Sequence, residues 1–181
     1  MKTIYVFWLS ILLLLLTNGC KKDTVDDSII IELDGKTYKS LTVDDFESLS
    51  DTADWNIYPG GRFEFDSVNP FEGRNSIHLL PLTTCFELEK TEGVPVDPSK
   101  IYVVNFHYKM QPANTGFCVL FYMIIEQGNE YLATETMRGT EGWFEKNVYF
   151  QPLNGIPVKI RIYVGNYTGV WLDNLIVFEE Y

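Results

Sequence analysis

The sequence predicts an all-β fold, an antiparallel β-sandwich, and three features support this prediction. Turn-forming pairs such as Asp34-Gly35, Asn69-Pro70 and Asn154-Gly155 recur at short intervals. The segments between them are rich in β-branched and aromatic residues, which favour strands. No segment after residue 28 has a helical repeat longer than one or two turns. Many short strands separated by turns are typical of sandwiches and barrels.

Two segments have the two-residue repeat of half-buried strands. In residues 101–110 the even positions are apolar or aromatic, and in residues 158–164 Val and Ile take every second position. Because successive side chains of a strand point to opposite faces, each strand is expected to bury one face and expose the other. The polar positions are Asn105, His107 and Lys109 in the first strand and Lys159, Arg161 and Tyr163 in the second.

Two more segments complete the predicted domain. Residues 116–126 are apolar on both faces, which predicts a strand in the middle of a sheet. Residues 29–38 predict a first hairpin with Asp34-Gly35 at its turn. A chain of this length normally forms one domain, which we place at residues 29–181.

The first 28 residues are predicted to direct export and not to form part of the folded domain. After Lys2, residues 4–16 are almost all apolar, and a run of about 13 residues is shorter than the ~20 that span a bilayer. This pattern is typical of an export signal. Gly19-Cys20 resembles the lipobox of bacterial lipoproteins, which implies a signal peptide at 1–19, an acylated Cys20 and a tether at 20–28. The alternative is an uncleaved anchor helix with an incidental Cys20.

The charged residues after Cys20 suggest a location. Lys21, Lys22 and Asp23 resemble the tag of surface-exposed lipoproteins of the Bacteroidetes type, although a solvated tether is equally polar. The resemblance implies a protein anchored in the outer membrane through Cys20 and facing the cell exterior.

The charge of the chain restricts its partners. It carries 25 acidic and 14 basic residues, a net charge of −11. Such a chain repels nucleic acid and anionic lipid, so we expect no nucleic-acid partner. Neutral or cationic partners and divalent metal suit it better.

Catalytic patterns are absent from the sequence. It has no Gly-x-Ser-x-Gly motif, P-loop or dinucleotide fingerprint, and its two histidines fall in strand-like segments. We therefore expect no enzyme. Cys85 and Cys118 either form a disulfide, which an exported protein permits, or remain two buried thiols.

Several short motifs follow one another in an order that resembles a known family. They resemble the galactose-binding-like jelly roll, in particular carbohydrate-binding modules of families 4, 9 and 22. The resemblance covers about residues 42–181 and implies a jelly-roll β-sandwich, with Trp143 and Trp171 in its core. The motifs are VDDFES at 43–48, NSIHL at 75–79, NFHYK at 105–109, GW at 142–143 and VWLDNLIV at 170–177.

The same resemblance implies a structural Ca²⁺ site. The matching positions are Glu47 and Asp173, with carbonyl oxygens expected from residues 73–75. Carboxylate and carbonyl oxygens are the ligands that Ca²⁺ prefers. The alternative is that Glu47 and Asp173 only cap strand ends in solvent.

Candidate sugar-binding residues come from two surfaces. Sugar sites combine aromatic rings with a few well-placed polar groups. One surface is the loop 55–62, and the other is the polar face of the two alternating strands, expected to lie side by side in one groove. Alternatives remain open: Trp55 in the core, and Lys109 and Arg161 on a solvated sheet face. The candidates are Trp55, Tyr58, Asn105, His107, Lys109, Arg161 and Tyr163.

These observations predict a surface lipoprotein that binds a polysaccharide or oligosaccharide without cleaving it. It would hold the glycan for an outer-membrane transporter or for glycan-degrading enzymes. The alternative is a structural or adhesive protein that uses the same sandwich for protein–protein contact.

Overall fold

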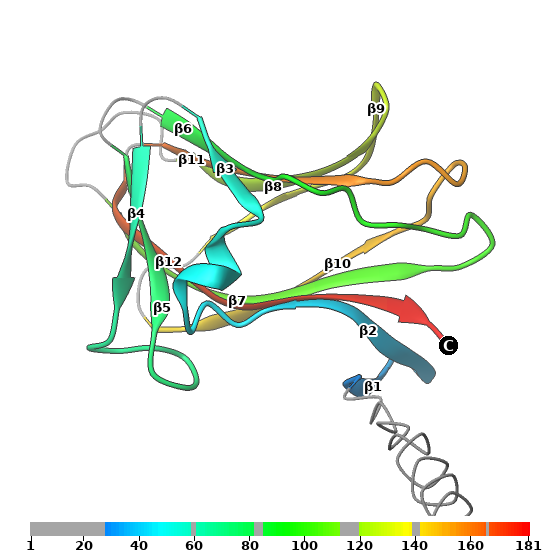
Figure 1. Ribbon diagram of the computed structural model, residues 1–181, viewed down its shortest axis with the longest axis horizontal. Helices are drawn as coiled ribbons and strands as arrows, with labels where there is room; N and C mark the ends of the chain where they lie inside the picture. Colours follow the sequence, from blue (N-terminus) through cyan, green and yellow to red (C-terminus); the bar gives the residue numbers. More distant parts are fainter. Residues whose placement is uncertain (1–27, 59–60, 82–84, 113–119, 139–141, 166) are drawn as a thin grey trace, which may run out of the picture.

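The computed structural model describes residues 28–58, 61–81, 85–112, 120–138, 142–165 and 167–181 (Figure 1). Within these residues no helix is long and apolar enough to span a membrane. The signal peptide, Cys20, most of the tether and Cys118 lie outside the described residues, so the disulfide stays a prediction.

Two antiparallel sheets face each other and form a jelly-roll β-sandwich, as predicted (Figure 1). Besides the strands there is a short 3₁₀ helix at Leu49–Thr52. Sheet A contains β1 Ile30–Leu33, β2 Lys36–Asp44, β4 Gly61–Asp66, β5 Ser76–Pro81, β7 Tyr102–Pro112, β10 Phe144–Phe150 and β12 Tyr167–Glu180. Sheet B contains β3 Trp55–Ile57, β6 Cys85–Lys90, β8 Leu120–Gln127, β9 Glu130–Thr136 and β11 Lys159–Gly165.

The two sheets have different arrangements. In sheet A, the first half of β12 pairs with β5 and its second half with β2, while β7 pairs along β12 and also with β10. In sheet B the order is β3-β6-β11-β8-β9. The predicted strands at 101–110 and 158–164 correspond to β7 and β11. The described part of the predicted strand at 116–126 corresponds to β8, which lies inside its sheet as expected, and residues 116–119 lie outside the described residues.

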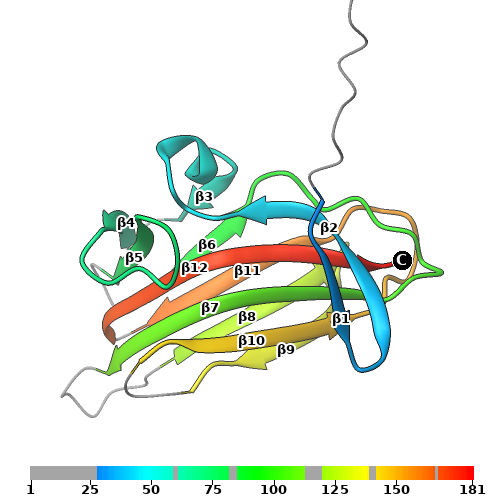
Figure 2. The same cartoon turned by 90° about the horizontal axis from the view of Figure 1, so that it is seen from below.

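The predicted first hairpin is also confirmed. Asp34 and Gly35 join β1 to β2 with φ values of 51° and 76°. Two consecutive positive φ values define the primed turn that matches the twist of a two-residue hairpin. The hairpin lies across the outer face of sheet A (Figure 2), where Ile31 and Leu33 pack against a small apolar cluster of Tyr38, Val103 and Phe178.

The main core fills the space between the sheets. Alternate residues of each strand point into it, as the two-residue repeat requires. In β11, for example, Ile160, Ile162 and Val164 are fully buried, while Arg161 and Tyr163 are partly exposed.

A buried ion pair connects the two sheets. Lys90 of β6 lies 2.8 Å from Asp44 of β2, and their side chains are only 6% and 5% exposed. Burial raises the pKa of Asp44, and Lys90 opposes that increase. The Lys90 ammonium group also lies 5.3 Å from the ring centre of Trp55. The pair is costly to break because either partner alone would be a buried, uncompensated charge.

We predict that Lys90→Met destabilises the protein by about 3–5 kcal/mol, since it leaves Asp44 without its cation. Urea unfolding of the purified protein measures this. The double variant Asp44→Leu/Lys90→Met is expected to be more stable than the single variant, because it removes both charges. Equal stability of Lys90→Met and the unmodified protein would contradict the role given to this pair.

Candidate functional site

The outer face of sheet B brings together side chains from all five of its strands. Residues paired across neighbouring strands point to the same face of a sheet. The backbone N–H of Tyr58 donates to the carbonyl of Glu87 at 3.0 Å, which continues the pairing past the end of β3. The strand registers therefore place two rows on this face: Tyr58, Glu87, Tyr163, Tyr122 and Thr136, and Asn56, Glu89, Arg161, Ile124 and Thr134.

Arg161 lies at the centre of this face among three carboxylates. Its Nη2 is 2.8 Å from Glu126, and its Nε is 2.9 Å from Glu89 and 3.3 Å from Glu87. Lys159 adds a second ion pair with Glu89 at 3.0 Å. Burial alone lowers the pKa of Arg161, but the hydrogen bond with Tyr163 and the three carboxylates raise it overall. The guanidinium group is therefore a fixed cation whose charge is already compensated.

Tyrosine rings lie in the row next to this cation. Tyr122 and Tyr163 stack with 4.7 Å between ring centres and an interplanar angle of 8°. Tyr58, at the edge formed by β3, is 42% exposed. Burial raises the pKa of Tyr163, so its hydroxyl group stays protonated near neutral pH. The face thus combines flat aromatic rings with planar polar groups.

The structure separates the predicted sugar-binding residues into three places. Tyr58, Arg161 and Tyr163 come together on the outer face of sheet B. The predicted single groove is wrong, because β7 and β11 belong to different sheets and expose their polar side chains on opposite sides of the sandwich. Trp55 is 6% exposed and packs near Phe46 in the core, so it provides no exposed platform.

The polar side chains of β7 lie on the outer face of sheet A and contact neighbouring residues. Lys109 lies 5.0 Å and 4.4 Å from the ring centres of Trp143 and Trp171. Both tryptophans are partly exposed, which corrects the expectation that they belong to the core. His107 stacks on Phe71 with 3.6 Å between ring centres, and Asn105 is buried and donates hydrogen bonds to Glu145 and Asn147. Burial lowers the pKa of Lys109 and of His107.

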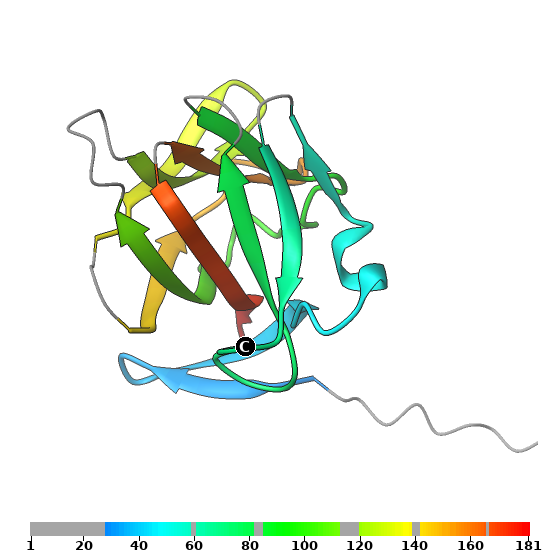
Figure 3. The ribbon, with the colours of Figure 1, turned by 90° about the vertical axis from the view of Figure 1, so that its left-hand side faces the viewer.

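The two residues of the predicted calcium site hold one loop from two sides. This loop connects β4 to β5 and lies near the end of β2 (Figure 3). Asp173 accepts hydrogen bonds from the backbone N–H groups of Phe71 at 2.9 Å and Glu72 at 3.2 Å. Glu47 accepts from the N–H group of Arg74 at 2.8 Å and 3.0 Å. The loop thus directs amide groups to both carboxylates, whereas carbonyl oxygens were expected from residues 73–75.

The environment of Asp173 is unfavourable for a negative charge. Asp173 is fully buried, so it is not a solvated cap. Burial, with a smaller contribution from the charge of Glu47, raises its pKa to about 6. A hollow of about 350 Å³ beside Glu47 is also lined by Asp45, Glu72 and Asn174. Among the described residues no three or more His, Cys, Asp or Glu side chains form a metal-binding group.

The donor atoms nevertheless fit a hard cation. A carboxylate offers about four lone-pair sites, so the hydrogen bonds from the loop leave Glu47 and Asp173 further acceptor capacity. Carboxylate oxygens are among the ligands that Ca²⁺ takes. Gly73 is needed here, because a Cβ atom at this position would overlap the Glu47 carboxylate.

Four residues of the sheet B face were missed in the sequence as sugar-site candidates: Glu87, Glu89, Tyr122 and Glu126. The alternation of Cys85–Lys90, in which Glu87 and Glu89 flank Leu88, carries the signal for two of them. Tyr122 lies within a run that is apolar on both faces, where nothing in the sequence distinguishes it.

The sandwich has the fold of carbohydrate-binding modules. No family model and no curated protein matches the sequence. Among solved structures, the CBM22-1 xylan-binding domain of Xyn10C from Paenibacillus barcinonensis has a TM-score of 0.55 and 14% identity, covering 78% of this chain and 94% of that one. The module TmCBM61, solved with β-1,4-galactotriose, has a TM-score of 0.54 and 17% identity, covering 71% and 90%.

An enzyme is also similar in structure. The Stig cyclase Fisc from Fischerella sp. TAU, solved with (3Z)-3-(1-methyl-2-pyrrolidinylidene)-3H-indole, has a TM-score of 0.61 and 17% identity, covering 84% of this chain and 98% of that one. At such identities the likeness establishes the fold alone.

Proposed function

We propose that the protein is a non-catalytic glycan-binding module whose site is the outer face of sheet B. The observation that carries this proposal is the row of Tyr58, Tyr163 and Tyr122 next to the fixed Arg161 on that face. Rings of this kind stack on the apolar side of a pyranose, and the neighbouring carboxylates and guanidinium group suit its hydroxyls. Several of the similar solved structures are carbohydrate-binding modules, which supports the same class of ligand.

The size of the face favours a chain of sugars. Four spacings of about 4.8 Å separate β3 from β9, so the face is about 19 Å wide, more than one sugar ring needs. The carboxylates favour binding over catalysis, because a glycosidase needs one of its two carboxyl groups as an acid. Here Glu89 and Glu126 both form ion pairs with Arg161, so both carboxylates are already engaged.

We predict that Tyr163→Ala weakens binding of a retained polysaccharide at least about tenfold, or ~1.4 kcal/mol, because it removes half of the stacked pair. Native affinity gels against a panel of soluble polysaccharides measure this. Trp143→Ala, an aromatic truncation on the outer face of sheet A, is the matched control and should retain binding. Loss of binding in Trp143→Ala but not in Tyr163→Ala would contradict the proposal and place the site on sheet A.

A structural Ca²⁺ at Glu47 and Asp173 is the second part of the proposal. The cation would offset the repulsion between two carboxylates, one of them fully buried. It would also fix the β4–β5 loop, whose Phe71 packs on the outer face of sheet A.

We predict that Ca²⁺ raises the Tm of EDTA-treated protein by about 5–10 °C at pH 7, since a ligand at 100 times its Kd adds about 2.7 kcal/mol. The pKa of Asp173 is raised to about 6, so the folded protein takes up a proton as pH falls through 6 while the unfolded chain stays ionised. The proton competes with Ca²⁺, so the increase in Tm should shrink from pH 7 to pH 5. Scanning calorimetry measures both effects.

Two variants test whether this is the right site. Glu47→Gln should abolish the increase in Tm, whereas Glu92→Gln, an exposed acid elsewhere, should leave it unchanged. An unchanged Tm on adding Ca²⁺ to the metal-free protein would remove the calcium site from the proposal.

Anchoring in the outer membrane through acylated Cys20, facing outward, completes the proposal. It is supported by the export-like segment at 1–19 and by the charged tether after Cys20. We predict that Cys20→Ser moves the protein from the membrane pellet to the soluble fraction of its host, while Cys118→Ser stays in the pellet. Membrane retention of Cys20→Ser would exclude the lipid anchor.

One observation favours the alternative of protein–protein contact. The first hairpin and its approach expose Ile29, Ile30, Leu41 and Val43, which are between 37% and 61% exposed. Exposed apolar groups that cluster in this way favour a docking surface. A folded protein that retains no polysaccharide, and whose Val43→Asp variant loses capture of a membrane partner, would favour this alternative.

A further inference from the structure

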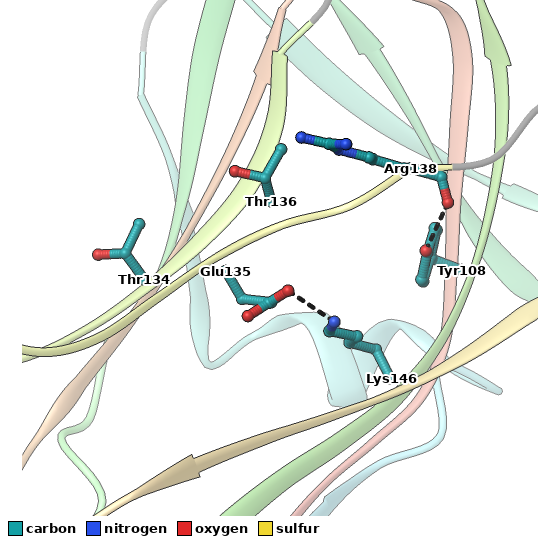
Figure 4. A pocket seen from close by; sticks show the side chains of 6 residues that line it. All are labelled: Tyr108, Thr134, Glu135, Thr136, Arg138 and Lys146. Atoms are coloured by element: carbon teal, nitrogen blue, oxygen red, sulfur yellow. Dashed lines mark hydrogen bonds and ion pairs between the residues drawn. The ribbon is translucent and has the colours of Figure 1, made fainter.

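A pocket opens at one edge of the sandwich, between β9 of sheet B and β10 of sheet A. Its volume is about 510 Å³, within the 300–1,000 Å³ typical of ligand sites. It is lined by Tyr108, Thr134, Glu135, Thr136, Arg138 and Lys146 (Figure 4).

The pocket has one uncompensated positive charge. Glu135 lies 2.6 Å from Lys146, so these two charges cancel. The Tyr108 hydroxyl group donates to the carbonyl of Arg138 at 2.8 Å and so fixes its backbone. The guanidinium group of Arg138 has no ion pair or hydrogen bond with any residue that the structure describes. Two cations and one carboxylate leave a net charge of +1, on a chain whose net charge is −11.

Arg138 also lies next to the proposed glycan site. Thr134, Thr136 and Arg138 are alternate residues, so they point to the same face. That face is the outer face of sheet B, because Thr136 pairs with Tyr122 and Thr134 with Ile124. Figure 4 shows Glu135 and Lys146 pointing toward each other, with Thr136 and Arg138 apart from this pair. The row that contains Tyr163 and Tyr122 therefore continues to Thr136, and Arg138 follows two residues later at the edge of the same face.

We propose that Arg138, with Thr136, binds the carboxylate of a uronic acid residue of the glycan. A guanidinium group matches a carboxylate with two parallel hydrogen bonds, and the threonine hydroxyl adds a further donor. Arg161 is unsuited to this role because three carboxylates surround it. The net charge of the chain opposes the contact only weakly, since charges beyond about 8 Å are screened at physiological salt. This inference rests on the proposed glycan-binding function.

The test uses acidic polysaccharides, each paired with its own carboxyl-reduced form. Glucuronoxylan, pectin and xanthan are run in native affinity gels at about 0.15 M salt, with unmodified protein, Arg138→Gln and Arg62→Gln. Arg62 is an exposed arginine on β4 of sheet A, so its variant loses the same charge far from the pocket. The unmodified protein should bind an acidic polymer about three- to tenfold more tightly than its reduced form. Arg138→Gln should abolish this preference and leave binding of the reduced form unchanged, and Arg62→Gln should change neither.

The outcomes separate this inference from the proposed function. Equal binding of an acidic polymer and its reduced form would overturn the uronate subsite and leave glycan binding intact. If Arg62→Gln and Arg138→Gln lost the preference for the acidic polymer to the same extent, the uronate subsite would also be overturned, because the preference would then follow from the total charge of the protein. No retention of any polysaccharide by folded protein would overturn both. Tighter, Arg138-dependent binding of sulfated xylan than of glucuronoxylan would replace the carboxylate with a sulfate ester.

Discussion

The hydrogen bonds that β12 makes with β2, β5 and β7 hold sheet A together. This 14-residue strand is irregular near its middle, where the register with β7 shifts between Asp173 and Ile176 and Asn174 has a φ of 46°. The irregularity frees the buried Asp173 carboxylate to hold the β4–β5 loop, which Glu47 holds from the other side. One break in one strand therefore positions a loop whose Phe71 then packs on His107 of β7.

The sandwich gives the protein two outer faces of different character. On sheet A, the ring faces of Trp143 and Trp171 are occupied by Lys109, and His107 is covered by Phe71. On sheet B, Tyr122 and Tyr163 stack on each other, and Arg161 forms ion pairs with the neighbouring carboxylates. A rigid set of side chains loses little entropy on binding. Sheet B is therefore the better platform for a ligand, although both faces carry aromatic rings.

Local patterns in the sequence were sufficient to predict three strands and the first hairpin. The alternation in β7 and β11 correctly identified which side chains face the core, and Asp34-Gly35 identified the position of the hairpin turn. Which strands share a sheet depends on pairing between distant residues, and no local pattern contains it. For that reason Asn105 and Arg161 were expected in one groove although they lie on opposite faces. Trp55 was ambiguous for the same reason, because only the position of β3 at the edge of sheet B decides that its ring points into the core.

The charge of the whole chain predicts its partners only coarsely. At the centre of the sheet B face, three carboxylates surround one arginine, and a neutral sugar suits this arrangement as the net charge of −11 suggests. At the β9 edge of this sheet, Glu135 is paired with Lys146, and Arg138 has no ion pair with any described residue. Because salt screens the electrostatic interaction between distant charges, each of these groups acts mainly on its neighbours. An acidic protein can therefore still contain a local site for an anion. The kind of ligand that suits this face therefore depends on how each charge is paired, which the structure supplies and the composition does not.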